Sequence, residues 1–121
     1  MHTPPISAVS IGLDAWAKKL SNYAHWVLAY DNEELAGYVA YYVNDEAHTA
    51  YIPLITVRAD YQRKGVGSGM FKALYQYLAG KYISVSLEVN KTNAKGLAFY
   101  NMQGFTIKED RSNKYLMGKD L

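Results

Sequence analysis

The sequence predicts a mixed α/β domain of the α+β type, in which helices flank a central sheet that is mostly antiparallel. Two features indicate this class. In residues 26–57, short apolar runs are separated by polar turns, which is typical of an antiparallel meander. After residue 65, apolar runs of helical and of strand periodicity alternate, as they do where helices cross over a sheet. A chain of 121 residues, half of them hydrophobic, is expected to form one domain over residues 1–121.

Local patterns predict each element in turn. We expect a helix near 13–22, strands at 26–30, 35–43 and about 47–57, a helix that begins near Ser68, a strand at 83–89, a helix at 94–102, and strands near 105–109 and 114–119. Alternation places four apolar residues on one face of their strand: Ile83, Val85, Leu87 and Val89. Helical spacing groups another four on one face of the helix that Gly80 ends: Val66, Met70, Leu74 and Leu78. Pro53 predicts a bulge, an edge or an irregular start in its strand, because proline has no N–H to donate.

The segment Gln62–Gly67, with the sequence QRKGVG, lies between an apolar strand and a helix. The free N–H groups of a first helical turn and the helix dipole favour an anion there. Gly65 and Gly67 have no Cβ to keep a ligand from the backbone. Arg63 and Lys64 add positive charge. The segment therefore predicts a pyrophosphate site, with a glycine-rich turn that binds nothing as the alternative.

The spacing excludes two common phosphate loops. A Walker loop needs Gly-Lys-Ser/Thr, which the chain lacks, and Met70 stands where a dinucleotide fingerprint needs its third glycine. The spacing of Gln62, Gly65 and Gly67 fits the remaining pattern, Q/R-x-x-G-x-G/A.

A second segment with a distinct residue pattern lies downstream. It combines the strand sequence Leu87-Glu88-Val89, then Asn93, and then Phe99-Tyr100-x-x-x-Gly104-Phe105. Together the two segments resemble motifs A and B of the GNAT superfamily of acyl-CoA N-acyltransferases, over about residues 35–105. The resemblance implies a GNAT-type sheet with a splayed parallel strand pair that holds the cofactor. It also implies that the N-terminal part is shorter than is usual in the family.

The resemblance implies acetyl-CoA as the acetyl donor and assigns residues to it. The pyrophosphate would be bound by Gln62, Arg63, Lys64, Gly65, Val66, Gly67 and Ser68. The pantetheine arm would contact the main chains of Ile55 and Val57 and the side chain of Asn93, for which a plain helix cap is the alternative. Tyr100 would protonate the leaving thiolate. Glu88 would be the general base, with a water, Asp45 or Asp60 as alternatives.

The expected function is therefore acetyl-CoA-dependent transfer of an acetyl group to a primary amine of a small molecule or protein. The alternative is a non-catalytic CoA-binding module that senses or scaffolds. A protein N-terminus, a lysine, an amino sugar and a polyamine all stay open as acceptors.

Composition excludes several other classes of protein and site. The absence of cysteine excludes disulfides and thiolate chemistry, and three scattered histidines predict no metal site. A net charge of +2 gives no reason to expect nucleic acid, and no apolar run is long enough for a membrane span. With no signal-peptide pattern at the N-terminus, we expect a cytoplasmic protein, for which a homodimer stays open.

Overall fold

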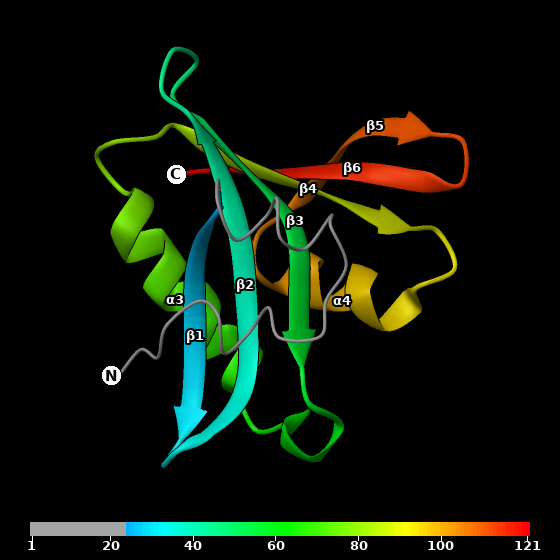
Figure 1. Cartoon of the computed structure of the whole chain (residues 1–121). Coiled ribbons are helices and arrows are strands. Elements are labelled where there is room, and N and C mark those ends of the chain that lie inside the picture. Colours follow the sequence, from blue (N-terminus) through cyan, green and yellow to red (C-terminus); the bar gives the residue numbers. More distant parts are fainter. Residues whose placement is uncertain (1–23) are drawn as a thin grey trace.

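The computed structural model describes residues 24–121, which form one six-stranded sheet and two α-helices (Figure 1). The elements are β1 (His25–Asp31), β2 (Glu34–Asn44), β3 (Thr49–Val57), the 3₁₀ turn η1 (Ala59–Tyr61), α3 (Val66–Leu78), β4 (Ser84–Asn90), α4 (Ala94–Met102), β5 (Thr106–Arg111) and β6 (Lys114–Asp120). The predicted fold class is confirmed, and the element ends differ from prediction by about one or two residues. The helix expected near 13–22 lies outside the described residues.

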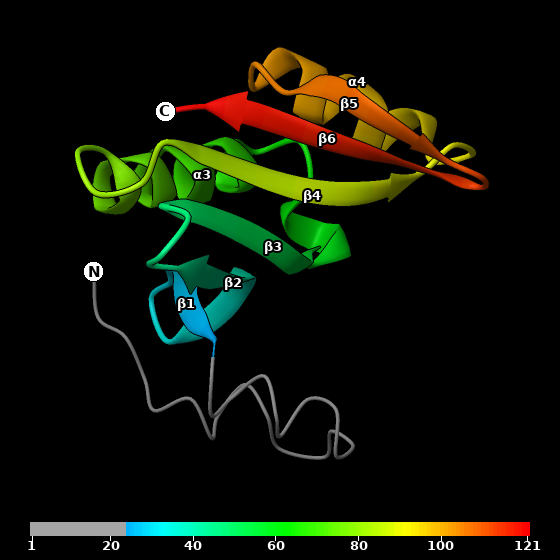
Figure 2. The same ribbon diagram turned by 90° about the horizontal axis from the view of Figure 1, so that it is seen from above.

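The strand order is β1-β2-β3-β4-β6-β5, and every neighbouring pair is antiparallel except β3 and β4. Seen from above in Figure 2, the strands change direction from β1 to β5, so the sheet is strongly twisted. The meander of β1, β2 and β3 comes first in the chain. The crossover through α3 then creates the single parallel pair.

The core lies between the sheet and its two helices, which are behind the strands in Figure 1. The buried face of α3 presents Met70, Phe71, Leu74 and Leu78. From β4, Val85, Leu87 and Val89 pack against this face, as the alternation predicts. Ile83 is a correction, because the strand begins only at Ser84. Its backbone bonds to His48 and Leu121 at the end of the sheet, and the residue is 65% exposed.

The parallel pair β3 and β4 separates halfway along its length. The two strands are paired only from Thr49 to Ile52 and from Ser84 to Leu87, although both continue beyond. At the point of separation, β3 carries one extra residue against β2, since Tyr51 faces Tyr42 and Leu54 faces Ala40. Pro53 lies in this bulge, where its missing N–H breaks no ladder. The ends of β3 and β4 therefore diverge, as Figure 1 shows, and the predicted splayed pair is confirmed.

Candidate active site

The diverging end of β3 directs backbone groups away from its one remaining partner, β2. The N–H of Arg58 donates to the carbonyl oxygen of Ala36 in β2 at 2.8 Å. Because successive residues of a strand point their N–H and C=O in opposite directions, Ile55 and Val57 point theirs toward the β4 side. Gln62 Nε2 donates to the Val57 carbonyl at 3.2 Å, while Ile55 lies beyond the last paired residue, Ile52. This edge of β3 has groups that a ligand with amides can pair with.

The loop after β3 leads directly into the N-terminus of α3. Residues 62–65 are exposed, and Arg63 and Gly65 adopt positive φ angles of 65° and 80°. Gly65 caps the helix, and its first turn contains no acidic residue. The first N–H groups of a helix have no carbonyl partner within it, so those of Val66, Gly67 and Ser68 are suited to an anion.

The two glycines of this loop have different roles. A Cβ built on Gly65 meets nothing within 4 Å, so no neighbour requires a glycine here. Glycine suits this position because the backbone is in the left-handed region, and without a side chain the space next to the helix N-terminus stays open. A Cβ on Gly67 would lie 3.1 Å from Cζ of Phe99 on α4. Gly67 is therefore needed for the close packing of α3 against α4, a role that the motif alone did not reveal.

Asn93 is the N-cap of α4. Its Oδ1 accepts a hydrogen bond from the N–H of Gly96 at 2.9 Å, which is the plain cap considered as the alternative. A Cβ on Gly96 would lie 2.5 Å from the Asn93 amide nitrogen, so this glycine makes room for the cap. The amide NH₂ of Asn93 is the part of the side chain left for a ligand.

Tyr100 packs in an aromatic cluster on the face of the sheet that carries α3 and α4. Its ring centroid lies 6.2 Å from that of Phe71, 5.6 Å from Phe99 and 6.1 Å from Phe105. Burial raises the pKa of the Tyr100 hydroxyl above its ordinary value of 10.0. The phenol therefore carries its proton at neutral pH, as a proton donor must.

Glu88 lies between Leu87 and Val89 on β4 and points to the opposite face of the sheet from Tyr100. Its Oε1 accepts from the hydroxyl of Tyr51 on β3 at 3.3 Å, and its Oε2 accepts from Nη1 of Arg111 on β5 at 3.2 Å. The side chain is 29% exposed. Burial, followed by the charge of Glu88, raises the pKa of Tyr51, so this hydroxyl stays a donor. The structure thus does not bring Glu88 into contact with Tyr100; the two lie on either side of the diverging strands.

The two alternative carboxylates are engaged elsewhere. Asp45 accepts from the hydroxyl of Tyr82 at 2.6 Å, and Asp60 pairs with Arg58 at 3.3 Å. Neither shares a hydrogen bond with Glu88.

Arg111 was missed as a site residue, and the contact of Tyr51 with Glu88 was not predicted, although Tyr51 is one of the strand tyrosines that could line a substrate site. Arg111 is separated from Glu88 by β6, and only the register of the last hairpin places it there. Counting outward from the turn at 112–113 pairs Arg111 with Lys114, and Lys114 lies opposite Asn90 on β4. This register would have placed Arg111 within reach of Glu88, which is two residues before Asn90.

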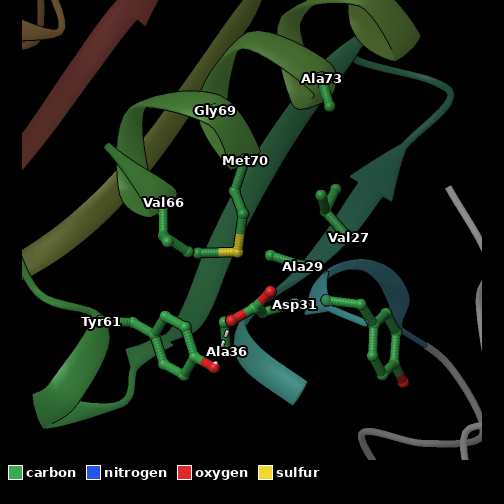
Figure 3. A pocket seen from close by; sticks show the side chains of 10 residues that line it. Val27, Ala29, Asp31, Ala36, Tyr61, Val66, Gly69, Met70 and Ala73 are labelled. Atoms are coloured by element: carbon green, nitrogen blue, oxygen red, sulfur yellow. Dashed lines mark hydrogen bonds between the residues drawn. The ribbon is translucent and has the colours of Figure 1, made fainter. Parts of the chain in front are cut away.

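A hollow of about 250 Å³ lies on the other side of the glycine loop, between α3 and the hairpin of β1 and β2 (Figure 3). Its apolar wall includes Val27, Ala36 and Met70. At its rim the Tyr61 hydroxyl donates to Asp31 at 2.8 Å, as Figure 3 shows, and to Glu34 at 3.2 Å. These contacts tie the first hairpin to the loop region. Among the predicted site residues, only Val66 lines this hollow.

The described residues contain no cluster of three metal-ligating side chains. Neither helix in residues 24–121 has the length and apolar character needed to cross a membrane.

The chain belongs to the acetyltransferase (GNAT) family, whose model matches residues 3–105. It is 35% identical over 71 residues to N-alpha-acetyltransferase 30 of Xenopus laevis, a match that covers 58% of this chain and 26% of that protein. Among solved structures it resembles Ard1 from Thermoplasma volcanium, with 27% identity and a TM-score of 0.66, over 73% of this chain and 64% of that one. The chain therefore spans about a quarter of the frog protein and just under two thirds of the archaeal one.

The ribosomal-protein-S18-alanine N-acetyltransferase of Escherichia coli has the same fold. It is 20% identical with a TM-score of 0.75, over 91% of this chain and 79% of that one. The PaiA N-acetyltransferase of Thermoplasma acidophilum, solved in complex with coenzyme A, is 15% identical with a TM-score of 0.76, over 95% and 84%. At these identities the likeness shows the fold.

Proposed function

We propose that this chain is an N-acetyltransferase that moves the acetyl group of acetyl-CoA to a primary amine. The observation that carries the proposal is the divergence of β3 and β4 next to the N-terminus of α3. One element directs the backbone groups of Ile55 and Val57 away from β2, the other offers an anion site, and CoA has an amide-containing arm joined to a pyrophosphate. The coenzyme A in the related PaiA structure supports the same ligand class.

Backbone groups would hold most of the donor. Ile55 and Val57 would bond to the pantetheine arm along β3, with the Asn93 amide beside it. The N–H groups of Val66, Gly67 and Ser68 and the exposed loop Gln62–Gly65 would bind the pyrophosphate, with Arg63 and Lys64 neutralising its charge. Holding the thioester against an amine in this way supplies a large part of the rate acceleration.

Two side chains would move the protons. Glu88 takes a proton from the acceptor ammonium, because only the neutral amine is a nucleophile. The amine nitrogen then bonds to the thioester carbonyl carbon, the carbon–sulfur bond breaks, and the nitrogen loses its second proton to solvent, to which Glu88 also releases the proton that it took. Tyr100 donates its proton to the leaving sulfur and recovers one from solvent. Their positions on opposite faces of the sheet support these roles, since the reacting group would lie between the diverging strands and be reached from both sides.

For the acceptor, we propose the N-terminal α-amine of a polypeptide. The support is the frog relative, which is named as an N-alpha-acetyltransferase. A lysine, an amino sugar and a polyamine are the competing acceptors.

The test is an acetylation screen with released CoA as the readout. Acetyl-CoA is supplied with peptides that have free N-termini, the same peptides with blocked N-termini and an internal lysine, amino sugars, and polyamines. We expect mass increases of one acetyl group only on free N-termini, and loss of turnover in Glu88→Gln and Tyr100→Phe. Calorimetric binding of CoA with no amine acetylated would contradict the proposal and favour a non-catalytic CoA-binding module.

A further inference from the structure

Both oxygens of the Glu88 carboxylate are held by neighbouring strands. Tyr51 donates to Oε1 from β3, and Arg111 donates to Oε2 from β5, across the intervening strand β6. A carboxylate has about four lone-pair sites, so two such bonds orient it and still leave sites that can take a proton.

Arg111 is itself oriented by a second carboxylate. Its Nε donates to Glu109 Oε1 at 3.0 Å and its Nη2 donates to Glu109 Oε2 at 3.2 Å, a two-point contact that fixes the plane of the guanidinium. Only Nη1 reaches Glu88. Glu109 also offsets the positive charge of Arg111, which would otherwise oppose the approach of an ammonium ion.

The neighbouring strands contribute few other charges near Glu88. Among residues 24–121, the titratable and charged groups beside it are Tyr51 on β3, Arg111 and Glu109 on β5, and Lys114 on β6, which stands two residues from Leu116, the direct partner of Glu88. Of these, Tyr51 and Arg111 touch the carboxylate.

We propose that Arg111 is a positioning residue that, oriented by Glu109, holds the Glu88 carboxylate in the place where it meets the acceptor. The inference rests on the proposed function, in which Glu88 is the base. It assigns a role in catalysis to the hairpin of β5 and β6, whose strand β5 is exposed along its whole length.

The experiment compares kcat and the KM for acetyl-CoA of the whole chain and three variants. Arg111→Gln removes the hydrogen bond that orients Glu88, so kcat should fall about tenfold with the KM for acetyl-CoA unchanged. Glu109→Gln removes the two-point contact that fixes the guanidinium, so kcat should fall less, again with an unchanged KM. Arg111→Lys should recover part of the activity, because it keeps the charge without the planar fork.

Asp110→Asn is the matched control. Asp110 is next to Arg111 on the same strand, but it pairs with Lys91 and not with the cluster around Glu88. Its kcat should match that of the unmodified chain. If Arg111→Gln and Glu109→Gln also keep the kcat of Asp110→Asn, the inference is overturned while the proposed function stands.

A second readout does not depend on turnover. The ionisation of Tyr51 is followed by NMR of ¹³C-labelled tyrosine, with the signal assigned by Tyr51→Phe. Because the charge of Arg111 lowers the pKa of Tyr51 and that of Glu88 raises it, Arg111→Gln should raise this pKa further. If the chain acetylates no amine, the proposed function fails and the inference, which rests on it, falls with it. If amines are acetylated, an unchanged pKa of Tyr51 in Arg111→Gln overturns the inference, and a raised pKa supports the contact of Arg111 with the Glu88 carboxylate.

Discussion

The two sides of the candidate active site consist of different chemical groups. The proposed donor side, comprising Ile55, Val57 and the loop 62–68, offers backbone groups whose direction is set by a bulge, a left-handed glycine and a helix start. The proposed acceptor side is made of side chains, with Glu88 held by Tyr51 and Arg111 from separate strands.

This difference teaches where each side is vulnerable. A backbone site tolerates changes of side chain and fails when the chain path changes. A site made of side chains fails when one hydrogen-bond donor or one charge is removed, since the position of each side chain depends on its contacts with the others. The predictions below use this contrast, beginning with the largest effect.

Removing the base should affect the acceptor side alone. Glu88→Gln keeps the size of the side chain and its bonds to Arg111 and Tyr51 within reach, but it cannot take a proton at neutral pH. We expect kcat to fall by about a hundredfold or more, with CoA affinity unchanged by calorimetry. Equal loss of CoA binding would mean that the two sides are not separable.

Changing the chain path of the loop should affect the donor side alone. Gly65→Val introduces a branched side chain at a φ of 80° and fills the open space outside the helix N-terminus. We expect CoA to bind about tenfold more weakly, because a branched residue disfavours this backbone conformation by roughly 1–2 kcal/mol. Gly69→Ala is the control, since Gly69 is helical with nothing within 4 Å of an added Cβ. If both variants bind CoA equally well, the loop is not the pyrophosphate site.

The neighbouring glycine should behave differently. Gly67→Ala pushes against the Phe99 ring, 3.1 Å from the added Cβ, within the packed aromatic cluster. We expect a loss of about 1 kcal/mol in the free energy of unfolding, measured with urea, from overpacking. The loss of CoA affinity should be smaller than in Gly65→Val. The reverse order of effects would assign Gly67 to the ligand and not to the helix contact.

The smallest effect concerns the hydrogen bonds by which Tyr61 links the hairpin of β1 and β2 to the loop region. The hydrogen bond from Tyr61 to Asp31, followed by desolvation and then by the hydrogen bond to Glu34, raises the pKa of Tyr61 to about 12 from its ordinary value of 10.0. Since the folded value is the higher one, this stabilisation is complete below pH 10 and is lost as the pH rises through about 12. Urea midpoints should therefore fall between these pH values, and fall less steeply in Tyr61→Phe. Identical slopes would show that the bonds do not persist in solution.

The contrast between the two sides also explains what could be predicted from sequence. The strands and helices of residues 24–121 were predicted because polar turns and apolar periods are local signals. The splayed pair was predicted because Pro53 and the motifs mark it. Ile83 was misassigned because alternation does not reveal where a ladder begins.

Arg111 was missed for a different physical reason. It acts across β6 on a residue of β4, and such a contact depends on the register of two strand pairs and not on any motif. The role of Gly67 likewise depends on how closely α3 approaches α4, which its own sequence context does not reveal.

The central claim is that CoA lies along the diverging end of β3, next to the N-terminus of α3. Amide NMR of the ¹⁵N-labelled chain, recorded with and without CoA, tests this most directly. The account predicts that the N–H signals of Ile55, Val57 and residues 66–68 shift and become protected from exchange. Shifts confined to Val27, Ala29 and Ala36, around the hollow between α3 and the first hairpin, with Ile55 and Val57 unchanged, would contradict it.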